Sequence, residues 1–159
     1  MNPAEVLQGI SDALHGTKAT SSDIEFLTNS VPNNLMPNWL VSLLSKYKLA
    51  GTEFSLNPKD DQSGFGAEVI WLTPMQLVSE AYDSEPGTSV RPLGLLPIGA
   101  CAIGSGDPYF LDLRVTSNDP PVVRVPHDYA GRGVYPLEKI ELVASSLSHF
   151  FGAARITSI

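Results

Sequence analysis

The chain has 159 residues, 43% of them hydrophobic and 17% charged, which is the composition of one folded domain and not of a disordered segment. Its formal net charge of −7 argues against nucleic-acid binding, which normally needs lysine and arginine clusters to face the phosphates. No apolar run approaches the roughly 20 residues that span a bilayer, and the single cysteine forms no internal disulfide, so we expect a cytoplasmic protein without a membrane segment.

Residues 1–50 predict three helices. Asn2 and Pro3 are typical of a helix start, and the apolar residues that follow share one face until Gly16. A second, short helix is expected at Ser22-Asp-Ile-Glu25, which has capping-box spacing. A third is expected from about Asn38 to near residue 51, with an apolar stripe that includes Trp39.

Two short strands are expected next, separated by an exposed loop. Thr52–Leu56 and Ala67–Leu72 are β-prone, and Trp71 takes a core position in the second. The intervening Asn57–Gly66 is rich in proline, glycine and polar residues, so we expect Asp60 and Asp61 to form an exposed acidic pair.

A capping box at Thr73-Pro-Met-Gln76 then predicts the clearest helix start in the chain. Residues 80–91, which contain Pro86-Gly87, predict an irregular, mobile connection. The apolar run after it predicts a strand, in which Cys101 between two alanines is expected to be a buried structural thiol.

The strongest strand signal runs from Tyr109 to Val115, where side chains alternate between two faces. A dense turn signal separates it from Val122–Val125, so the two segments are expected to pair antiparallel. Leu111 and Leu113 should then lie in or beside the core, with Asp112 on the opposite face. Glycines 99, 104 and 106 join strands and open no helix, so we interpret them as turn residues with positive φ and not as a nucleotide-binding loop.

Residues 137–151 allow two interpretations. Their apolar residues could form one long helix, or a shorter helix could begin at Ser145 or Ser146. Consecutive serines cap helices well and are poor in helix interiors, which favours the shorter helix.

Several of these segments, in this order, resemble the SUKH superfamily over roughly residues 24–151. The matching pieces are Met36-Pro37 before an apolar helix, Leu96-Pro97, Gly106-Asp107 before a strand that ends in Leu111-Asp112-Leu113, Val123–Asp128, and Ala144–Phe151. The resemblance implies a short strand around residues 140–143 before the last helix. With the element order, it predicts a single α+β domain over residues 1–159, with N-terminal helices in 1–50 and a sheet-containing core in 52–159. We expect a largely antiparallel sheet of five to six strands with helices packed on one side.

The superfamily includes bacterial immunity proteins that neutralise toxins and a fungal cell-wall-synthesis regulator that acts as an interaction hub. The resemblance therefore implies a non-catalytic protein-binding domain, with a partner such as a basic toxin domain and with no cofactor or metal. An acidic chain suits a basic partner. The candidate contact residues lie in loops and comprise Asp60, Asp61, Phe65, Asp119, His127, Asp128 and Tyr129.

The alternative is a small ligand-binding domain or hydrolase that uses carboxylates and a histidine at strand ends. Its candidate residues are Asp107, Asp112, His127 and Asp128. Ser105 offers a hydroxyl, but the Gly-x-Ser-x-Gly elbow is absent and a strand follows the turn. A cleft with clustered carboxylates would favour this alternative, whereas a broad acidic face would favour protein binding.

Overall fold

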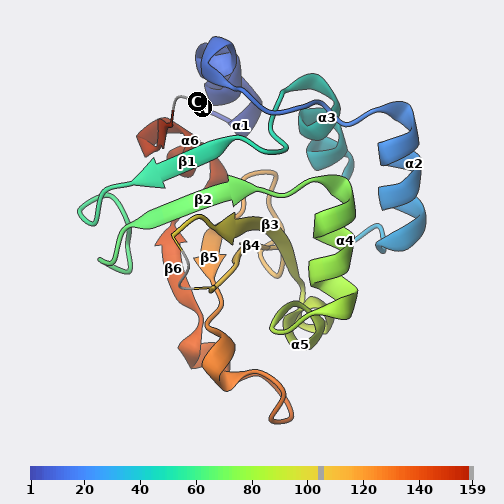
Figure 1. The fold of residues 1–159 in the computed structure, drawn as a ribbon, viewed down its shortest axis with the longest axis vertical. Coiled ribbons are helices and arrows are strands. Elements are labelled where there is room, and N and C mark those ends of the chain that lie inside the picture. Colours follow the sequence, from blue (N-terminus) through green and yellow to red (C-terminus); the bar gives the residue numbers. More distant parts are fainter. Residues whose placement is uncertain (104–105, 158–159) are drawn as a thin grey trace.

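One curled antiparallel sheet organises the computed structural model, which describes residues 1–103 and 106–157 (Figure 1). Seven strands pair in the order β6-β5-β4-β3-β2-β1-β7, and every pairing is antiparallel. The strands are β1 (Glu53–Leu56), β2 (Ala67–Trp71), β3 (Leu95–Cys101), β4 (Tyr109–Asp112), β5 (Val122–Arg124), β6 (Glu141–Ala144) and β7 (Arg155–Ile156).

Six α-helices accompany the sheet in the described residues, so the predicted α+β class with an antiparallel sheet is confirmed. The helices are α1 (Pro3–Ile10), α2 (Ser21–Ser30), α3 (Asn38–Lys46), α4 (Pro74–Asp83), α5 (Gly87–Val90) and α6 (Leu147–Ala153). The sheet has one strand more than the predicted range, because two residues after α6 pair with β1 as β7. None of the helices in residues 1–103 and 106–157 is long and apolar enough to cross a membrane.

The two faces of the sheet carry cores of different size. The larger core takes alternate strand residues such as Leu96, Leu111 and Val122, and all helices except α5 pack against it. The smaller core takes the neighbouring positions, including Phe110 and Val123, and is covered by α5 and by residues 125–140. The predicted placement of helices on one side therefore describes the main core, while the short α5 covers the other face.

The predicted hairpin is confirmed. β4 and β5 pair antiparallel, with Phe110 opposite Val123 and Leu111 opposite Val122. Leu111 is fully buried, Leu113 packs beside the larger core, and alternation puts Asp112 on the other face. The strand ends at Asp112 and does not continue to Val115, because that carboxylate turns back onto Arg114.

The predicted starts of α1 and α4 agree with the structure, where a side chain caps each helix. Asn2 caps α1, and Thr73 with Gln76 forms the predicted capping box of α4. The second helix starts earlier than predicted, because the capping box that forms is Thr20 with Asp23. The third helix ends at Lys46, five residues before the expected end at Gly51.

The segment from Glu80 to Arg91 is largely helical, and the predicted irregular connection is confined to residues 84–86 between α4 and α5. The Arg91 guanidinium donates to the Ala81 carbonyl at 3.0 Å and lies 4.1 Å from the centre of the Tyr82 ring. A Cβ atom at Gly87 would lie 1.8 Å from the Glu80 carbonyl oxygen, so only glycine permits this close approach. These contacts hold α4 and α5 together across the break.

The C-terminal ambiguity resolves to a strand followed by a helix. β6 ends at Ala144, and the Ser146 hydroxyl accepts the His149 N–H at the start of α6. Of the predicted turn glycines, Gly106 has a φ of +81°, whereas Gly99 lies inside β3 next to an irregularity in its pairing with β4. Gly104 is outside the described residues.

The sheet curls far enough that the β1–β2 loop meets the opposite edge. The Gln62 N–H donates to the Val143 carbonyl of β6 at 2.9 Å, although β6 and β1 are separated by four strands in the sheet order. This curl brings loop residues 57–66 over β5 and β6, where the candidate site lies.

Leu111→Ala should lower the free energy of unfolding by about 2–5 kcal/mol, because it leaves a cavity in the larger core. Val115→Ala is the matched control, since Val115 is 46% exposed and its truncation should change stability by less than about 0.5 kcal/mol. Urea unfolding of both variants measures the difference, and equal costs would contradict this assignment of the core.

Candidate functional site

A cleft of about 340 Å³ opens at the curled end of the sheet, between the β1–β2 loop, the end of β3 and strands β4 to β6. Its floor contains Tyr109 and Arg124, which are 2% and 6% exposed. Its sides carry the carboxylates of Glu68, Asp107 and Glu141 and the apolar side chains of Phe65 and Ile103.

Arg124 holds the floor together through contacts with the β1–β2 loop and with β6. From β5, its guanidinium donates to Asp61 Oδ2 at 3.1 Å and to the Gly66 carbonyl at 2.7 Å, both in the β1–β2 loop. It also donates to Ser63 Oγ at 2.9 Å and to Glu141 Oε1 of β6 at 3.1 Å. The side chain therefore crosslinks the loop to two strands at the far edge of the sheet.

Tyr109 completes the floor from β4. The Arg124 guanidinium lies 5.1 Å from the ring centre and donates to the hydroxyl at 3.4 Å. Burial raises the pKa of the Tyr109 hydroxyl above its ordinary value, so the phenol stays neutral. Burial alone would lower the pKa of the Arg124 guanidinium, but its bonds to Tyr109, Glu141 and Asp61 raise it, so the arginine stays charged.

The rim of the cleft combines exposed apolar side chains with acidic groups. Phe65 is 73% exposed and Ile103 is 75% exposed, and both line the cleft. The single positive charge of Arg124 faces four carboxylates, namely the buried Asp61 and the lining Glu68, Asp107 and Glu141. The cleft is therefore acidic, with apolar side chains at its mouth.

Asp107 also pairs with His127, beside the cleft. The Asp107 Oδ1 atom lies 2.7 Å from His127 Nδ1 and accepts the His127 backbone N–H at 3.0 Å. Among the candidate carboxylates, it is therefore Asp107 that pairs with this histidine and not the adjacent Asp128. Asp128 is exposed on the same 3-10 turn, His127–Tyr129, and the partner of the histidine comes from the β3–β4 connection.

Glu80 of α4 lies near this pair and is half-buried. Burial raises the pKa of the Glu80 carboxyl, and the positive potential of His127 and the Gly87 N–H oppose that increase. One carboxylate oxygen of Glu80 is buried with no hydrogen-bond partner among the described residues.

The prediction that Asp60 and Asp61 form an exposed acidic pair is wrong for Asp61, which is 4% exposed. It accepts hydrogen bonds from the Ser63 N–H and hydroxyl and pairs with Arg124. A charge reversal at Asp61 would bury two like charges, so this residue belongs to the framework and not to the contact surface. Asp60 is half-exposed in the same loop.

Two other predicted contact residues lie away from the cleft. Asp119 accepts hydrogen bonds from the Ser148 N–H and hydroxyl and so anchors the first turn of α6. Tyr129 is half-buried against the smaller core, with Lys139 Nζ 5.0 Å from its ring centre. Of the predicted set, only Phe65 lines the cleft directly, while Asp61 supports its floor and His127 borders it through Asp107.

Sequence reasoning missed Arg124, Glu68, Ile103 and Glu141. Arg124 had one usable signal, because a charged residue inside the apolar run Val122–Val125 needs a partner if both faces of the strand are buried. Cys101 was expected to be buried, but it is partly exposed: it packs against the edge of the larger core and also lines the cleft.

The residues of the catalytic alternative do not come together as a group. Asp107 meets His127, but Asp112 forms a bidentate pair with Arg114 at 2.8 and 2.9 Å, and Asp128 is exposed on the turn His127–Tyr129. Ser105 lies outside the described residues. Within residues 1–103 and 106–157, no group of three metal-ligating side chains is close enough to hold an ion.

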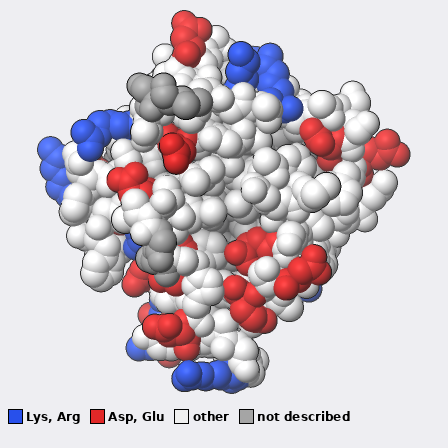
Figure 2. Space-filling model, in the orientation of Figure 1, with Lys and Arg blue, Asp and Glu red and all other residues white. Residues whose placement is uncertain are grey.

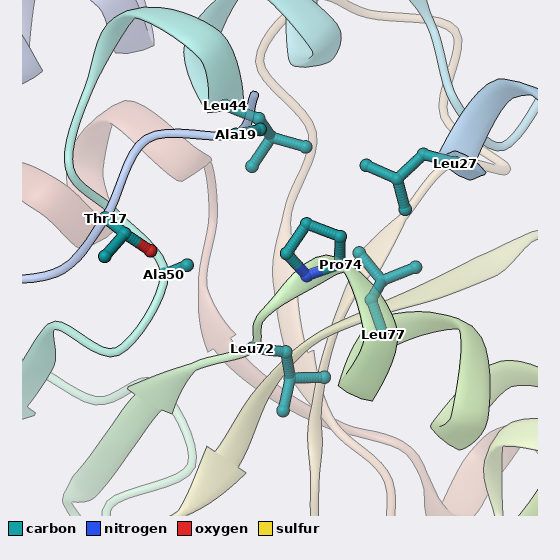
Figure 3. A pocket seen from close by; sticks show the side chains of 8 residues that line it. All are labelled: Thr17, Ala19, Leu27, Leu44, Ala50, Leu72, Pro74 and Leu77. Atoms are coloured by element: carbon teal, nitrogen blue, oxygen red, sulfur yellow. The ribbon is translucent and has the colours of Figure 1, made fainter. Parts of the chain in front are cut away.

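A second, apolar cavity lies under α2, α3 and the start of α4 (Figure 3). Its volume of about 10 Å³ is near the minimum for one water molecule, and leucine, alanine and proline side chains line most of it. It is a gap in packing and is too small for a substrate.

Comparison with known proteins adds no relative: no protein-family model, no curated protein and no solved structure matches this chain.

Tyr135 offers a test of the segment that positions His127. Its buried hydroxyl donates to the Pro126 carbonyl at 2.7 Å, and burial raises the pKa of Tyr135 to about 12. Since an unfolded tyrosine has a pKa near 10, its contribution to stability is complete below about pH 10 and is lost as pH rises toward 12.

Tyr135→Phe should therefore cost about 1 kcal/mol at pH 7, and this deficit should shrink between about pH 10 and pH 12. Urea unfolding at several pH values measures it. A deficit that is constant or grows over this interval would contradict the assignment.

Proposed function

We propose that the protein works by stoichiometric binding to another protein, and that the acidic cleft contacts a basic segment of that partner. The observation that carries this proposal is the pairing of two exposed apolar side chains, Phe65 and Ile103, with an acidic cleft. Exposed large apolar groups beside a polar cleft are typical of interaction sites.

The two kinds of group supply different parts of binding. Carboxylates of Glu68, Asp107 and Glu141 attract a basic partner and speed encounter, an effect that weakens as salt increases. Phe65 and Ile103 can bury apolar area against the partner and so slow its dissociation. The floor needs no rearrangement for this, because Arg124 is already neutralised by Asp61 and Glu141.

The partner is proposed to be a basic toxin domain, which would make the protein a bacterial immunity protein of the SUKH type. The order of motifs described above and the acidic cleft support this proposal. A cytoplasmic location belongs to the same proposal and agrees with a single cysteine that cannot form an internal disulfide.

Phe65→Ser with Ile103→Ser should abolish retention of a partner that the wild-type protein retains at one-to-one stoichiometry. The measurement is affinity capture of a candidate basic toxin domain, at 50 and 300 mM salt. Met75→Ser is the matched control, because Met75 is 75% exposed on α4 and does not line the cleft. Cys101 gives an independent readout, since a bound partner should slow its reaction with a thiol reagent.

Equal retention by the cleft variant and the control would contradict the cleft as the contact surface. Turnover of a small substrate that His127→Ala abolishes in a folded protein would contradict the binding function itself.

A further inference from the structure

Three of the five lysines in this acidic chain line one groove, which shares no lining residue with the acidic cleft. Lys18, Lys46 and Lys48 line a groove of about 430 Å³ beside the end of α1 and the end of α3. Figure 2 shows basic side chains gathered near the top of the view, where the chain leaves α1. All three lysines are exposed.

The backbone holds the lysines together across thirty residues of sequence. On one side of Lys18, the Thr17 N–H donates to the Ala50 carbonyl at 2.8 Å, and on the other the Ala19 N–H donates to the Leu44 carbonyl at 2.8 Å. Lys18 is therefore fixed beside the segment that carries Lys46 and Lys48.

Gly16 and Thr52 lock this crossing. The Gly16 N–H donates to the Lys48 carbonyl at 3.1 Å and to Thr52 Oγ1 at 3.0 Å, and the buried Thr52 hydroxyl donates to the same carbonyl at 2.7 Å. A Cβ atom at residue 16 would lie 2.1 Å from the Ala50 oxygen, so glycine is required there. The frame that presents the lysines is thus specific and rigid.

The positive charge of the groove is largely uncompensated. Asp12 is the one carboxylate among its lining residues, so the lining carries three positive charges against one negative charge. Among the described residues, none of the three lysines forms an ion pair within 4.0 Å. Lys46 and Lys48 also complement the C-terminal end of the α3 dipole, but Lys18 comes from a separate segment and that effect does not account for it.

From this arrangement we propose that the groove binds a compact polyanion, with a chain of linked phosphates as the fitting class of ligand. Its volume suits a small molecule, and its remaining lining offers the polar side chains of Gln8 and Ser11. Lysine ammonium groups bind phosphate oxygens as point charges and need no fixed geometry. Nucleic acid is disfavoured, because a net charge of −7 repels an extended polyanion.

The test is isothermal titration with sodium tripolyphosphate in 20 mM salt, at which surface charges are weakly screened. Wild-type protein should bind one equivalent saturably. The triple variant Lys18→Gln/Lys46→Gln/Lys48→Gln should bind at least about tenfold more weakly, since each exposed charge contact contributes about two- to fivefold. Lys59→Gln is the control, because Lys59 is an exposed lysine outside the groove. It should retain the wild-type affinity within about twofold.

A parallel titration with adenosine triphosphate identifies the source of the phosphates. Equal affinity would show recognition of the phosphate chain alone, and tighter binding would extend the site to a nucleotide. Absence of saturable binding to either ligand, equal loss in the control and the triple variant, or tighter binding of single-stranded DNA would overturn the proposal. Thermal unfolding of each variant excludes loss of fold as the cause.

Discussion

The buried pair between Arg124 and Asp61 is the interaction on which the curled sheet depends. Arg124 projects from β5 and Asp61 from the β1–β2 loop, and the two are 63 residues apart in sequence. Nearly complete burial makes each charge costly without the other, so the pair is tolerable only because Ser63, Gly66, Tyr109 and Glu141 satisfy the remaining donors and acceptors. Together with the bond from Gln62 to Val143, it fastens the loop to the far edge of the sheet.

This constraint links the fold to the candidate site. The same guanidinium that fastens the β1–β2 loop to the far edge of the sheet forms the floor of the cleft, and that loop presents Phe65 at the rim. Asp61 and Glu141 neutralise the charge of Arg124, so the carboxylates that line the cleft make its net charge negative. Binding by such a site needs a preorganised surface and no conformational change, which agrees with a role in stoichiometric recognition.

Local signals in the sequence predicted most of the framework, and non-local contacts account for what they missed. Alternation identified β4 and β5, and side-chain caps identified α1, α4 and α6, because both depend on residues close in sequence. Asp61 was misassigned as exposed because its loop has every local mark of solvent exposure, while its partner lies on a distant strand. The contacts of Asp107 and Asp119 could not be predicted for the same reason. Asp107 binds His127 from another connection, and Asp119 anchors α6 from the β4–β5 turn.

A double-mutant cycle on Arg124→Met and Asp61→Asn, measured by urea unfolding, tests the role of this pair most directly. Each single variant should lose about 3–5 kcal/mol, because it leaves a buried charge or polar group without its main partner. The double variant should lose about as much as one single variant, so that the coupling energy exceeds about 2 kcal/mol. Losses that add within about 0.5 kcal/mol would show that the two residues act independently and would contradict the account.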